Sequence, residues 1–328
     1  MTQRILLIRM LGLGDVTCIG IPALRYFKQQ FPDAEMTFLT FAAGKDIIQL
    51  AEPDVKIQVL ENGQWPESII PAMETFLGLA EEIIGVGYDQ IINLDTWFMP
   101  CFLSRFLKDA GEKVIGNTLA ISVAELVDKF QDQSLKPEFV NDPAMYMQSS
   151  FFGMMRWHTT WWESVALPNM GYPEFYLRTC CGFDQLDMDM QIDVKADHQL
   201  KKIGKNKKII AFAPDARTSE RNYPYGSQLK KLLEEAGYHV WTGFDGSVSM
   251  RQTLAQLKAS DLLVTAPSAP QWLATTVGCP SLVICADVDP RTLMPEYATD
   301  PSPIVIPPEN LLESIQSIFA EAESDANE

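Results

Sequence analysis

Residues 4–15 read Arg-Ile-Leu-Leu-Ile-Arg-Met-Leu-Gly-Leu-Gly-Asp, and this stretch decides the fold class. The run from Ile5 to Ile8 is continuously apolar, which is typical of a strand buried on both faces of a parallel sheet. Gly12 and Gly14 then provide a turn, and apolar residues recur at helical spacing over 19–27. The stretch therefore predicts a strand, a glycine turn and a helix, in that order.

The same alternation of strands and helices continues through the chain. In the first half it predicts strands over 36–40, 56–60, 90–94 and 113–115, with helices over 45–51 and 73–84. It restarts with strands over 208–213, 238–242, 261–265, 281–285 and 303–306, and helices over 228–236, 253–259 and 271–277. Such alternation implies parallel sheets with right-handed crossovers, so we expect an α/β protein of two doubly wound halves.

The pattern also predicts domain boundaries. We expect an N-terminal domain over 1–178, a linker over 179–207, a C-terminal domain over 208–308, and a helix with an acidic tail over 309–328. Six lysines within 195–208 indicate an exposed linker edge rather than a nucleic-acid patch.

Residues 116–173 break the strand–helix rhythm and are dense in Met, Phe and Trp. Stripes of these residues usually form core, so we expect a helical insertion that packs its own core. The alternative is a platform on which a sugar ring or a base stacks.

Charge limits the partners of this chain of 328 residues. Its 26 Lys and Arg against 43 Asp and Glu give a net charge of −17, which repels phosphate backbones and anionic membranes. Any contact with nucleic acid must therefore be local.

The six cysteines are scattered, with neither a C-x₂-C pair nor a nearby histidine, so we expect reduced, mostly buried thiols and no metal site. Arg9 and Asp15 interrupt the first apolar stretch before it could act as a signal peptide. No apolar run approaches the roughly 18–20 residues that span a bilayer. These features predict a cytoplasmic protein with no integral membrane segment.

The glycine turn of residues 12–15 should line a ligand site, because ligands of open α/β sheets lie at the carboxyl ends of strands. A nicotinamide enzyme is disfavoured, since Thr17 stands where a third glycine would be expected and residues 40–42 lack the acidic residue that would end the second strand. Asp15 has two interpretations here. It could cap the helix, or it could act as a general base.

Two loops of the second half could bind a diphosphate. The loop over 214–224 carries two guanidinium groups and two hydroxyls, which clamp phosphate oxygens well, although an ordinary polar surface loop is the alternative. Its candidate donor-binding residues are Arg217, Thr218, Ser219 and Arg221. Further on, Ser268 and Ala269 begin a predicted helix whose free N–H groups could bind an anion, with Pro267 and Pro270 each removing one donor.

Asp245 lies in Gly-Phe-Asp-Gly after a strand of the second half. It could hold a ribose hydroxyl of the donor, or it could simply be a turn aspartate beside a glycine.

Several of these segments carry a resemblance. The segments 5–16, 21–25, 31–34 and 88–94, the loop 213–224, and Ser268 with 273–274 and 277–280 resemble the heptosyltransferase-type family of GT-B glycosyltransferases, family 9. The resemblance implies two Rossmann-like domains facing a cleft, and inverting sugar transfer from a nucleotide-sugar without a metal or other cofactor. It places Asp15 at the catalytic aspartate and Arg221 at a phosphate-binding lysine.

On the acceptor side the resemblance suggests five candidate binding residues: Gly12, Gly14, Asp95, His158 and Trp161. Taken alone, His158 would more often be structural.

The chain also departs from the family. Pro267, Ala269 and Trp272 replace the acidic residue, glycine and histidine of a D-x-G-x-x-H-L-A pattern, and residues 93–96 depart from D-x-Q-G. Because the first pattern helps to hold the donor, the sequence does not identify ADP-heptose as the donor.

The predicted function is a metal-independent inverting glycosyltransferase that acts on a glycan or another hydroxylated acceptor, with Asp15 as general base. One alternative is a GT-B enzyme that glycosylates a hydroxylated nucleobase in DNA, which the acidic composition argues against. Another is a non-catalytic protein that binds nucleotides or sugars.

Overall fold

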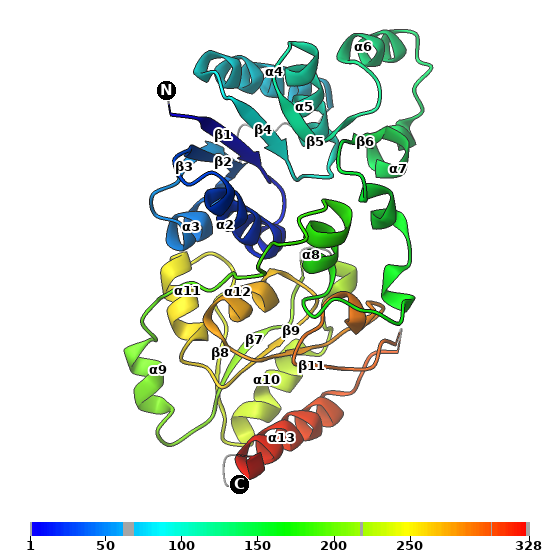
Figure 1. The fold of residues 1–328 in the computed structure, drawn as a ribbon. Helices are drawn as coiled ribbons and strands as arrows, with labels where there is room; N and C mark the ends of the chain where they lie inside the picture. The colour runs from blue at the N-terminus through cyan, green and yellow to red at the C-terminus, as the bar shows by residue number, and fades with distance from the viewer. Residues whose placement is uncertain (1, 62–68, 217–218, 303, 326–328) are drawn as a thin grey trace. The chain divides into compact units, whose positions relative to one another are not determined.

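The computed structural model describes residues 2–61, 69–216, 219–302 and 304–325. The chain divides into two compact units, Met1–Met190 and Gln191–Glu328 (Figure 1). Each unit has its own sheet with helices on both faces, as the alternating pattern predicts.

The sheet of the first unit has six strands in the order β3-β2-β1-β4-β5-β6. Their bounds are β1 Arg4–Ile8, β2 Glu35–Phe41, β3 Lys56–Leu60, β4 Gln90–Asn93, β5 Val114–Leu119 and β6 Met147–Ser149. All pairs are parallel except β5 with β6. The chain winds outward from β1 to one edge and returns to begin the other side at β4. This reversal makes β1 and β4 neighbours and creates a switch point at their carboxyl ends, where ligands bind in such sheets.

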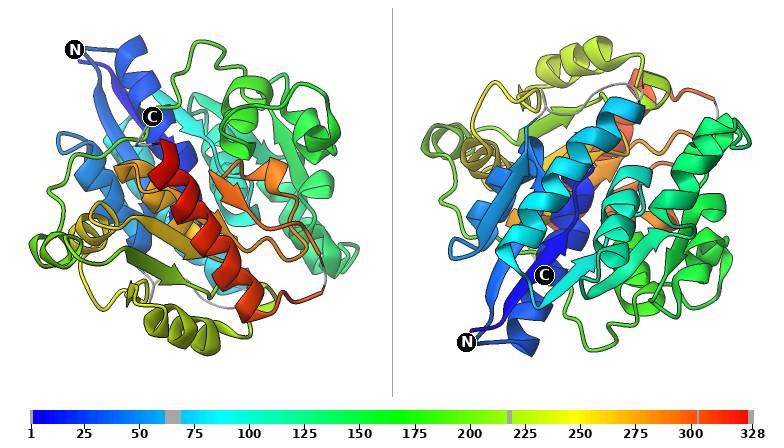
Figure 2. Two further views of the ribbon diagram at one scale, coloured as in Figure 1. Left: turned by 90° about the horizontal axis from the view of Figure 1, so that it is seen from below. Right: turned by 90° about the horizontal axis from the view of Figure 1, so that it is seen from above.

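Two layers of helices cover this sheet. α4 (Ile69–Val86) and α5 (Phe98–Asp109) lie side by side on one face (Figure 2). There Phe76 and Phe102 pack with Leu6 and Ile8 of β1. The opposite face is covered by α1 (Leu13–Asp15), the π-helix η1 (Val16–Gly20), α2 (Ile21–Gln30) and α3 (Ala42–Ala51). Pro22 is the second residue of α2 and has no backbone N–H to donate to the preceding helical turn. Its position is consistent with the wider π turn that comes before α2.

The Met- and Trp-rich segment differs from the expected helical insertion. It consists of α6 (Val123–Gln131), η3 (Pro137–Asn141), α7 (Pro143–Tyr146), β6, η4 (Met154–His158), η5 (Trp161–Glu163), α8 (Tyr172–Glu174) and η6 (Phe175–Cys180). Part of it packs on the main core and not on a core of its own, because Leu126 and Tyr146 belong to the same cluster as Phe76. Its predicted start is wrong, since β5 extends to Leu119.

The second unit has a fully parallel sheet in the order β11-β10-β9-β7-β8. Its strands are β7 Ile209–Ala213, β8 His239–Trp241, β9 Leu262–Thr265, β10 Ser281–Val283 and β11 Tyr297–Ala298. α10 (Gly226–Glu235) and α13 (Pro308–Asp325) pack together on one face, and α11 (Met250–Leu257) contacts α12 (Ala269–Val277) (Figures 1 and 2). The order reverses between β7 and β9, which places a second switch point there.

Sequence and structure differ at three further places. For the strand predicted over 303–306, position 303 lies outside the described residues and Ile304 to Ile306 form no strand, so the prediction is wrong. Pro301 and Pro307 flank that stretch and cannot donate to a ladder. The lysine-rich stretch includes a helix, α9 (His198–Ile203). α5 was not predicted at all, because its apolar residues surround Pro100 and do not form a simple stripe.

The structure also describes the environment of the cysteines and the character of the helices. All six cysteines are buried and unpaired, as expected of reduced thiols. Across the described ranges, no helix combines the length and the apolar character needed to cross a bilayer.

The fold makes a testable prediction at Gly116. Its φ of +100° is left-handed, and an added Cβ would lie 2.2 Å from the backbone oxygen of Asn93 in the neighbouring strand. Gly111 is a matched control, with φ +97° but no atom within 4 Å of an added Cβ. We expect Gly111→Ala to cost about 1–2 kcal/mol of unfolding free energy, from backbone strain alone. Gly116→Ala should cost about 1–3 kcal/mol more, because strands must also shift apart. Urea denaturation measures both, and equal losses would contradict the steric explanation.

Candidate functional site

The switch point of the first unit holds a group of charged side chains. Arg9 and Asp15 follow β1, and Asp95 follows β4, so the ends of two adjacent strands bring together residues about 80 positions apart. The two strand ends are joined by the Leu94 amide, which donates to the Ile8 carbonyl at 2.9 Å.

Arg9 lies at the centre of this group, with its side chain only 4% exposed. One terminal nitrogen donates to Asp15 Oδ2 at 2.6 Å, and the other donates to the Leu94 carbonyl at 2.8 Å and lies 3.9 Å from Asp95 Oδ1. Burial by itself would lower the pKa of Arg9, but the charges of Asp15 and Asp95 outweigh it and raise the pKa above its usual range. The guanidinium therefore stays charged and links both carboxylates.

Asp15 is the accessible carboxylate of the site. Its side chain is 30% exposed, and its second oxygen, Oδ1, accepts a hydrogen bond from the Tyr172 hydroxyl at 2.6 Å. The helix-cap interpretation of Asp15 is wrong, because the residue is helical (φ −68°, ψ −36°) and its side chain makes no capping bond. The carboxylate instead faces Arg9 and Tyr172. Sequence reasoning missed both partners, although a charged residue at the end of a buried strand was a usable clue for Arg9.

Gly12 has a conformational role in this loop. Its φ of +81° is left-handed, and an added Cβ would come within 3.3 Å of Asp15 Oδ2. A side chain there would strain the turn and crowd the carboxylate. Gly14 lies inside α1. The acceptor contacts suggested for these two glycines stay predictions.

Asp95 is fully buried and serves the backbone. Its Oδ2 accepts hydrogen bonds from the amides of Met10 (2.7 Å) and Leu11 (3.2 Å), and Oδ1 accepts from the Trp97 amide at 3.1 Å. These bonds hold the loop that carries Asp15. A side chain without exposed surface cannot touch an acceptor, so the structure contradicts the acceptor role suggested for Asp95.

Among the tryptophans, Trp157 rather than Trp161 lies beside the site. Trp161 is buried and stacked on Phe175 (4.4 Å between centroids, 13° between planes), so its face is not free to bind an acceptor as suggested. Trp157 packs on the rings of Tyr172 (6.3 Å) and Tyr176 (4.9 Å). His158 is exposed at the end of η4, and its suggested acceptor role stays a prediction.

In the second unit, the predicted donor residues follow the strands of the switch point. Arg217 and Thr218 lie outside the described residues, while Ser219 and Arg221 form the exposed turn η7 after β7. Ser268 precedes α12, and its hydroxyl donates to the Ala266 carbonyl at 3.0 Å instead of capping the helix. Ala269 is the first residue of α12.

Asp245 fits its turn interpretation. It is exposed and accepts from the Ser247 amide at 3.0 Å. Hydrogen bonding from the Ser247 side chain, and then from its amide, lowers the pKa of Asp245. Its suggested contact with the donor stays a prediction.

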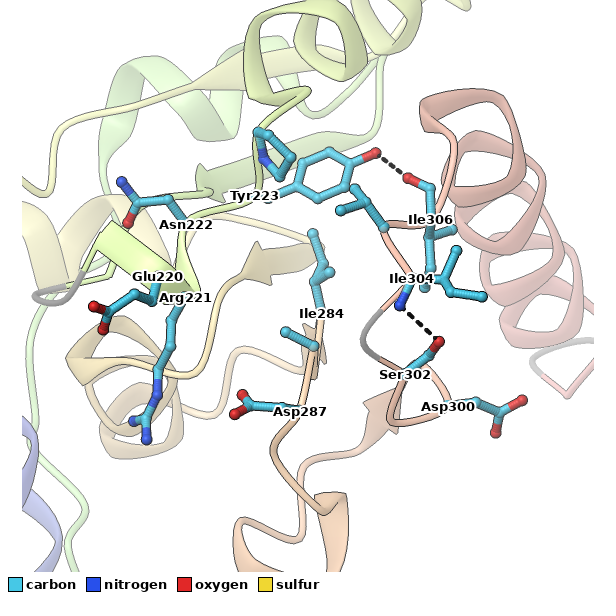
Figure 3. A pocket seen from close by; sticks show the side chains of 13 residues that line it. Glu220, Arg221, Asn222, Tyr223, Ile284, Asp287, Asp300, Ser302, Ile304 and Ile306 are labelled. Atoms are coloured by element: carbon cyan, nitrogen blue, oxygen red, sulfur yellow. Dashed lines mark hydrogen bonds between the residues drawn. The ribbon is translucent and has the colours of Figure 1, made fainter.

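The second unit also contains a pocket of about 310 Å³, which sequence reasoning missed except for Arg221 (Figure 3). Ile284, Ile304 and Ile306 form an apolar wall, and the Tyr223 hydroxyl donates to the Ile306 carbonyl at 2.7 Å. The lining carries one guanidinium, Arg221, and the three carboxylates of Glu220, Asp287 and Asp300. Loops that follow β7, β10 and β11 meet here, and this long-range combination left no local sequence pattern.

Within the part of the chain that the structure describes, no cluster of three or more His, Cys, Asp or Glu side chains is arranged to hold a metal ion.

Comparison with solved structures identifies the architecture. The chain is similar to a family 9 glycosyltransferase from Veillonella parvula, with a TM-score of 0.61, 14% identity, and coverage of 97% of this chain and 98% of the other. It is also similar to the E. coli heptosyltransferase WaaC with ADP (TM-score 0.58, 11% identity, coverage 96% and 99%). The chain has the GT-B fold. This confirms the fold resemblance expected from the sequence.

The GT-B fold also occurs in enzymes with a different reaction. A putative UDP-N-acetylglucosamine 2-epimerase from Listeria monocytogenes matches with a TM-score of 0.54, 13% identity, and coverage of 99% of this chain and 90% of the other. No protein-family model matches the sequence, and no curated protein matches it. The reaction must therefore be argued from the site.

The site predicts different outcomes for two aspartates. Asp95→Asn should lower the unfolding free energy by about 1–3 kcal/mol, because an amide group would oppose the donors that now face Oδ1 and Oδ2. Asp245→Asn should leave the denaturation midpoint unchanged, since the exposed turn tolerates asparagine. Urea denaturation of both variants compares them directly. An Asp95→Asn variant with unchanged stability would contradict the role of Asp95 in holding the loop that carries Asp15.

Proposed function

We propose that this GT-B protein transfers a sugar from a nucleotide-sugar to an acceptor hydroxyl, with inversion and without a metal, and that Asp15 is the general base. The observation that carries the proposal is the Asp15 carboxylate, which is partly exposed at the switch point of the first unit and held there by Arg9 and Tyr172.

The chemistry of single displacement requires such a group. The acceptor hydroxyl attacks the anomeric carbon as the bond to the diphosphate breaks, and its proton must pass to a base. A carboxylate has about four lone-pair positions, so Asp15 can keep its two hydrogen bonds and still accept a third. A carboxylate accepts the proton in its ionised form, and the Arg9 guanidinium lies beside it at 2.6 Å as a counter-charge.

The donor is proposed to bind the second unit. The heptosyltransferase neighbour is described with ADP and the epimerase neighbour is named for a UDP-sugar, so nucleotide diphosphates are ligands that suit the fold. Arg221 can contact phosphate oxygens at the edge of the pocket. Asp287 and the apolar wall of isoleucines suit an uncharged ring with hydroxyls, because carboxylates accept from hydroxyls but repel phosphates.

A second candidate is a binding protein without catalysis. It is favoured by the burial of Pro267 and Trp272, which stand where the resemblance leads us to expect an acidic residue and a histidine near the donor. Neither side chain can hydrogen-bond a donor from that position as a carboxylate or an imidazole would.

Asp15→Asn separates the two candidates. It removes the base but keeps the shape of the side chain, so we expect turnover to fall by roughly 10²–10⁴-fold while donor binding is retained. Thermal shift with a panel of nucleotide-sugars first identifies the donor, and a transfer assay with that donor then measures turnover. Asp33→Asn, at an exposed position of the same unit, is the control. Donor binding without turnover by the unsubstituted chain would favour the binding protein, and near-normal turnover of Asp15→Asn would exclude Asp15 as the base.

Arg221→Ala tests the donor site. Loss of a charged hydrogen bond to phosphate should raise the dissociation constant of the donor by roughly 10–100-fold. Arg251→Ala, which removes an exposed guanidinium elsewhere in the second unit, should leave it unchanged. Isothermal titration measures both constants, and equal values would remove Arg221 from the donor site.

A further inference from the structure

We propose that Tyr172 is a positioning residue that fixes the orientation and charge of the Asp15 carboxylate through its hydroxyl. This inference rests on the proposed function, because the base is the group that Tyr172 positions. Tyr172 lies 157 positions after Asp15, and no sequence pattern links the two residues.

The contacts of the Tyr172 hydroxyl define its role. It donates to Asp15 Oδ1 at 2.6 Å and lies 3.2 Å from the Cys18 thiol. Burial and the nearby charge of Asp15 raise the pKa of Tyr172 and also raise the pKa of Cys18. Both groups therefore keep their protons, and the hydroxyl remains a donor to Asp15 rather than a route by which a proton leaves.

The helix that carries Tyr172 is attached to the switch point at a second place. Tyr176 lies four residues later, on the same side of the continuous helical stretch formed by α8 and η6. Its hydroxyl donates to the Leu94 carbonyl at 2.8 Å and accepts from Asn117 at 3.0 Å. Trp157 packs against both tyrosine rings. The position of the Tyr172 ring is thus set independently of Asp15.

The two hydrogen bonds to Asp15 have different consequences. Arg9 holds Oδ2 alone, and a carboxylate held by one oxygen can still turn about its terminal bond. Tyr172 holds Oδ1 and so fixes the plane of the carboxylate. Without this bond the base should be more easily protonated and less often aligned with the acceptor.

Tyr172→Phe removes only the hydroxyl, and Tyr88→Phe is the matched control. The control removes another buried tyrosine hydroxyl of the first unit, at the amino end of β4, whereas the site lies at the carboxyl ends of the strands. The full chain, labelled with ¹³C at aspartate carboxyl carbons, is titrated by NMR, and the Asp15 signal is the one missing from Asp15→Asn.

We expect the pH midpoint of the Asp15 signal to be higher in Tyr172→Phe than in the unsubstituted chain, because a hydrogen bond to the ionised form is lost. Tyr88→Phe should leave the midpoint where it is in the unsubstituted chain. An unchanged midpoint in Tyr172→Phe, or an equal shift in both variants, would overturn the inference. Should Tyr172→Phe fail to fold, 3-fluorotyrosine at position 172 replaces it. That side chain is a stronger donor and should move the midpoint down.

Transfer kinetics with the donor found by thermal shift provide the second readout. Tyr172→Phe should lower kcat by roughly 10-fold with little change in KM, and should move the acidic limb of the kcat/KM profile to higher pH. Tyr88→Phe should show neither change. The NMR titration needs no substrate, so a shifted midpoint in a chain without transferase activity would count against the proposed function and leave the Tyr172–Asp15 contact established.

Discussion

The first unit depends on one buried charge. Arg9 leaves β1 with its side chain almost fully enclosed, and a charge in that position is tolerated only when it is paired and hydrogen-bonded. Its partners come from both strands of the switch point: Asp15 after β1, and Asp95 with the Leu94 carbonyl after β4. The parallel pairing of β1 with β4 and the position of the accessible carboxylate are therefore consequences of the same set of contacts. A shift of either strand by one residue would leave the guanidinium unpaired.

Much of the fold followed from local pattern. The apolar runs of β1 and of the strands that follow it are easy to recognise, because strands buried on both faces of a sheet tolerate few polar residues. The predictions failed where structure depends on distant contacts. β6 pairs antiparallel at an edge that no local pattern specifies, and α5 surrounds Pro100 without a simple apolar stripe. At 303–306 the error is of the opposite kind, because a strand was expected where none forms. The stretch is apolar in composition, but its prolines prevent strand pairing.

Only the part of the candidate site that directly follows a predicted strand could be found from the sequence. Asp15 could be found because it follows a glycine turn at the end of a strand. Its partners could not, because Tyr172 reaches it across 157 positions and Arg9 looked like an interruption of an apolar run. The residue type alone was equally uninformative for Asp95 and Trp161. Aspartate and tryptophan both commonly bind sugars, but here Asp95 holds a loop and Trp161 packs against Phe175. Burial, which sequence cannot supply residue by residue, separates the two uses.

If the second unit binds the donor as proposed, Pro267 and Trp272 affect the choice of donor more than they affect the proposed base, because Asp15 lies in the first unit. Trp272 is buried in α12, and the neighbouring Gln271 donates to the Leu293 carbonyl at 3.2 Å, so this part of the helix is occupied with packing. The start of α12 offers a ligand its backbone amides and the Ser268 hydroxyl. Amides and hydroxyls bind phosphate oxygens without regard to the base or sugar attached to them. On the proposed function, selection among donors would then come from the surrounding loops. The pocket beside Arg221, with its carboxylates and apolar wall, offers chemistry that can distinguish one sugar or base from another.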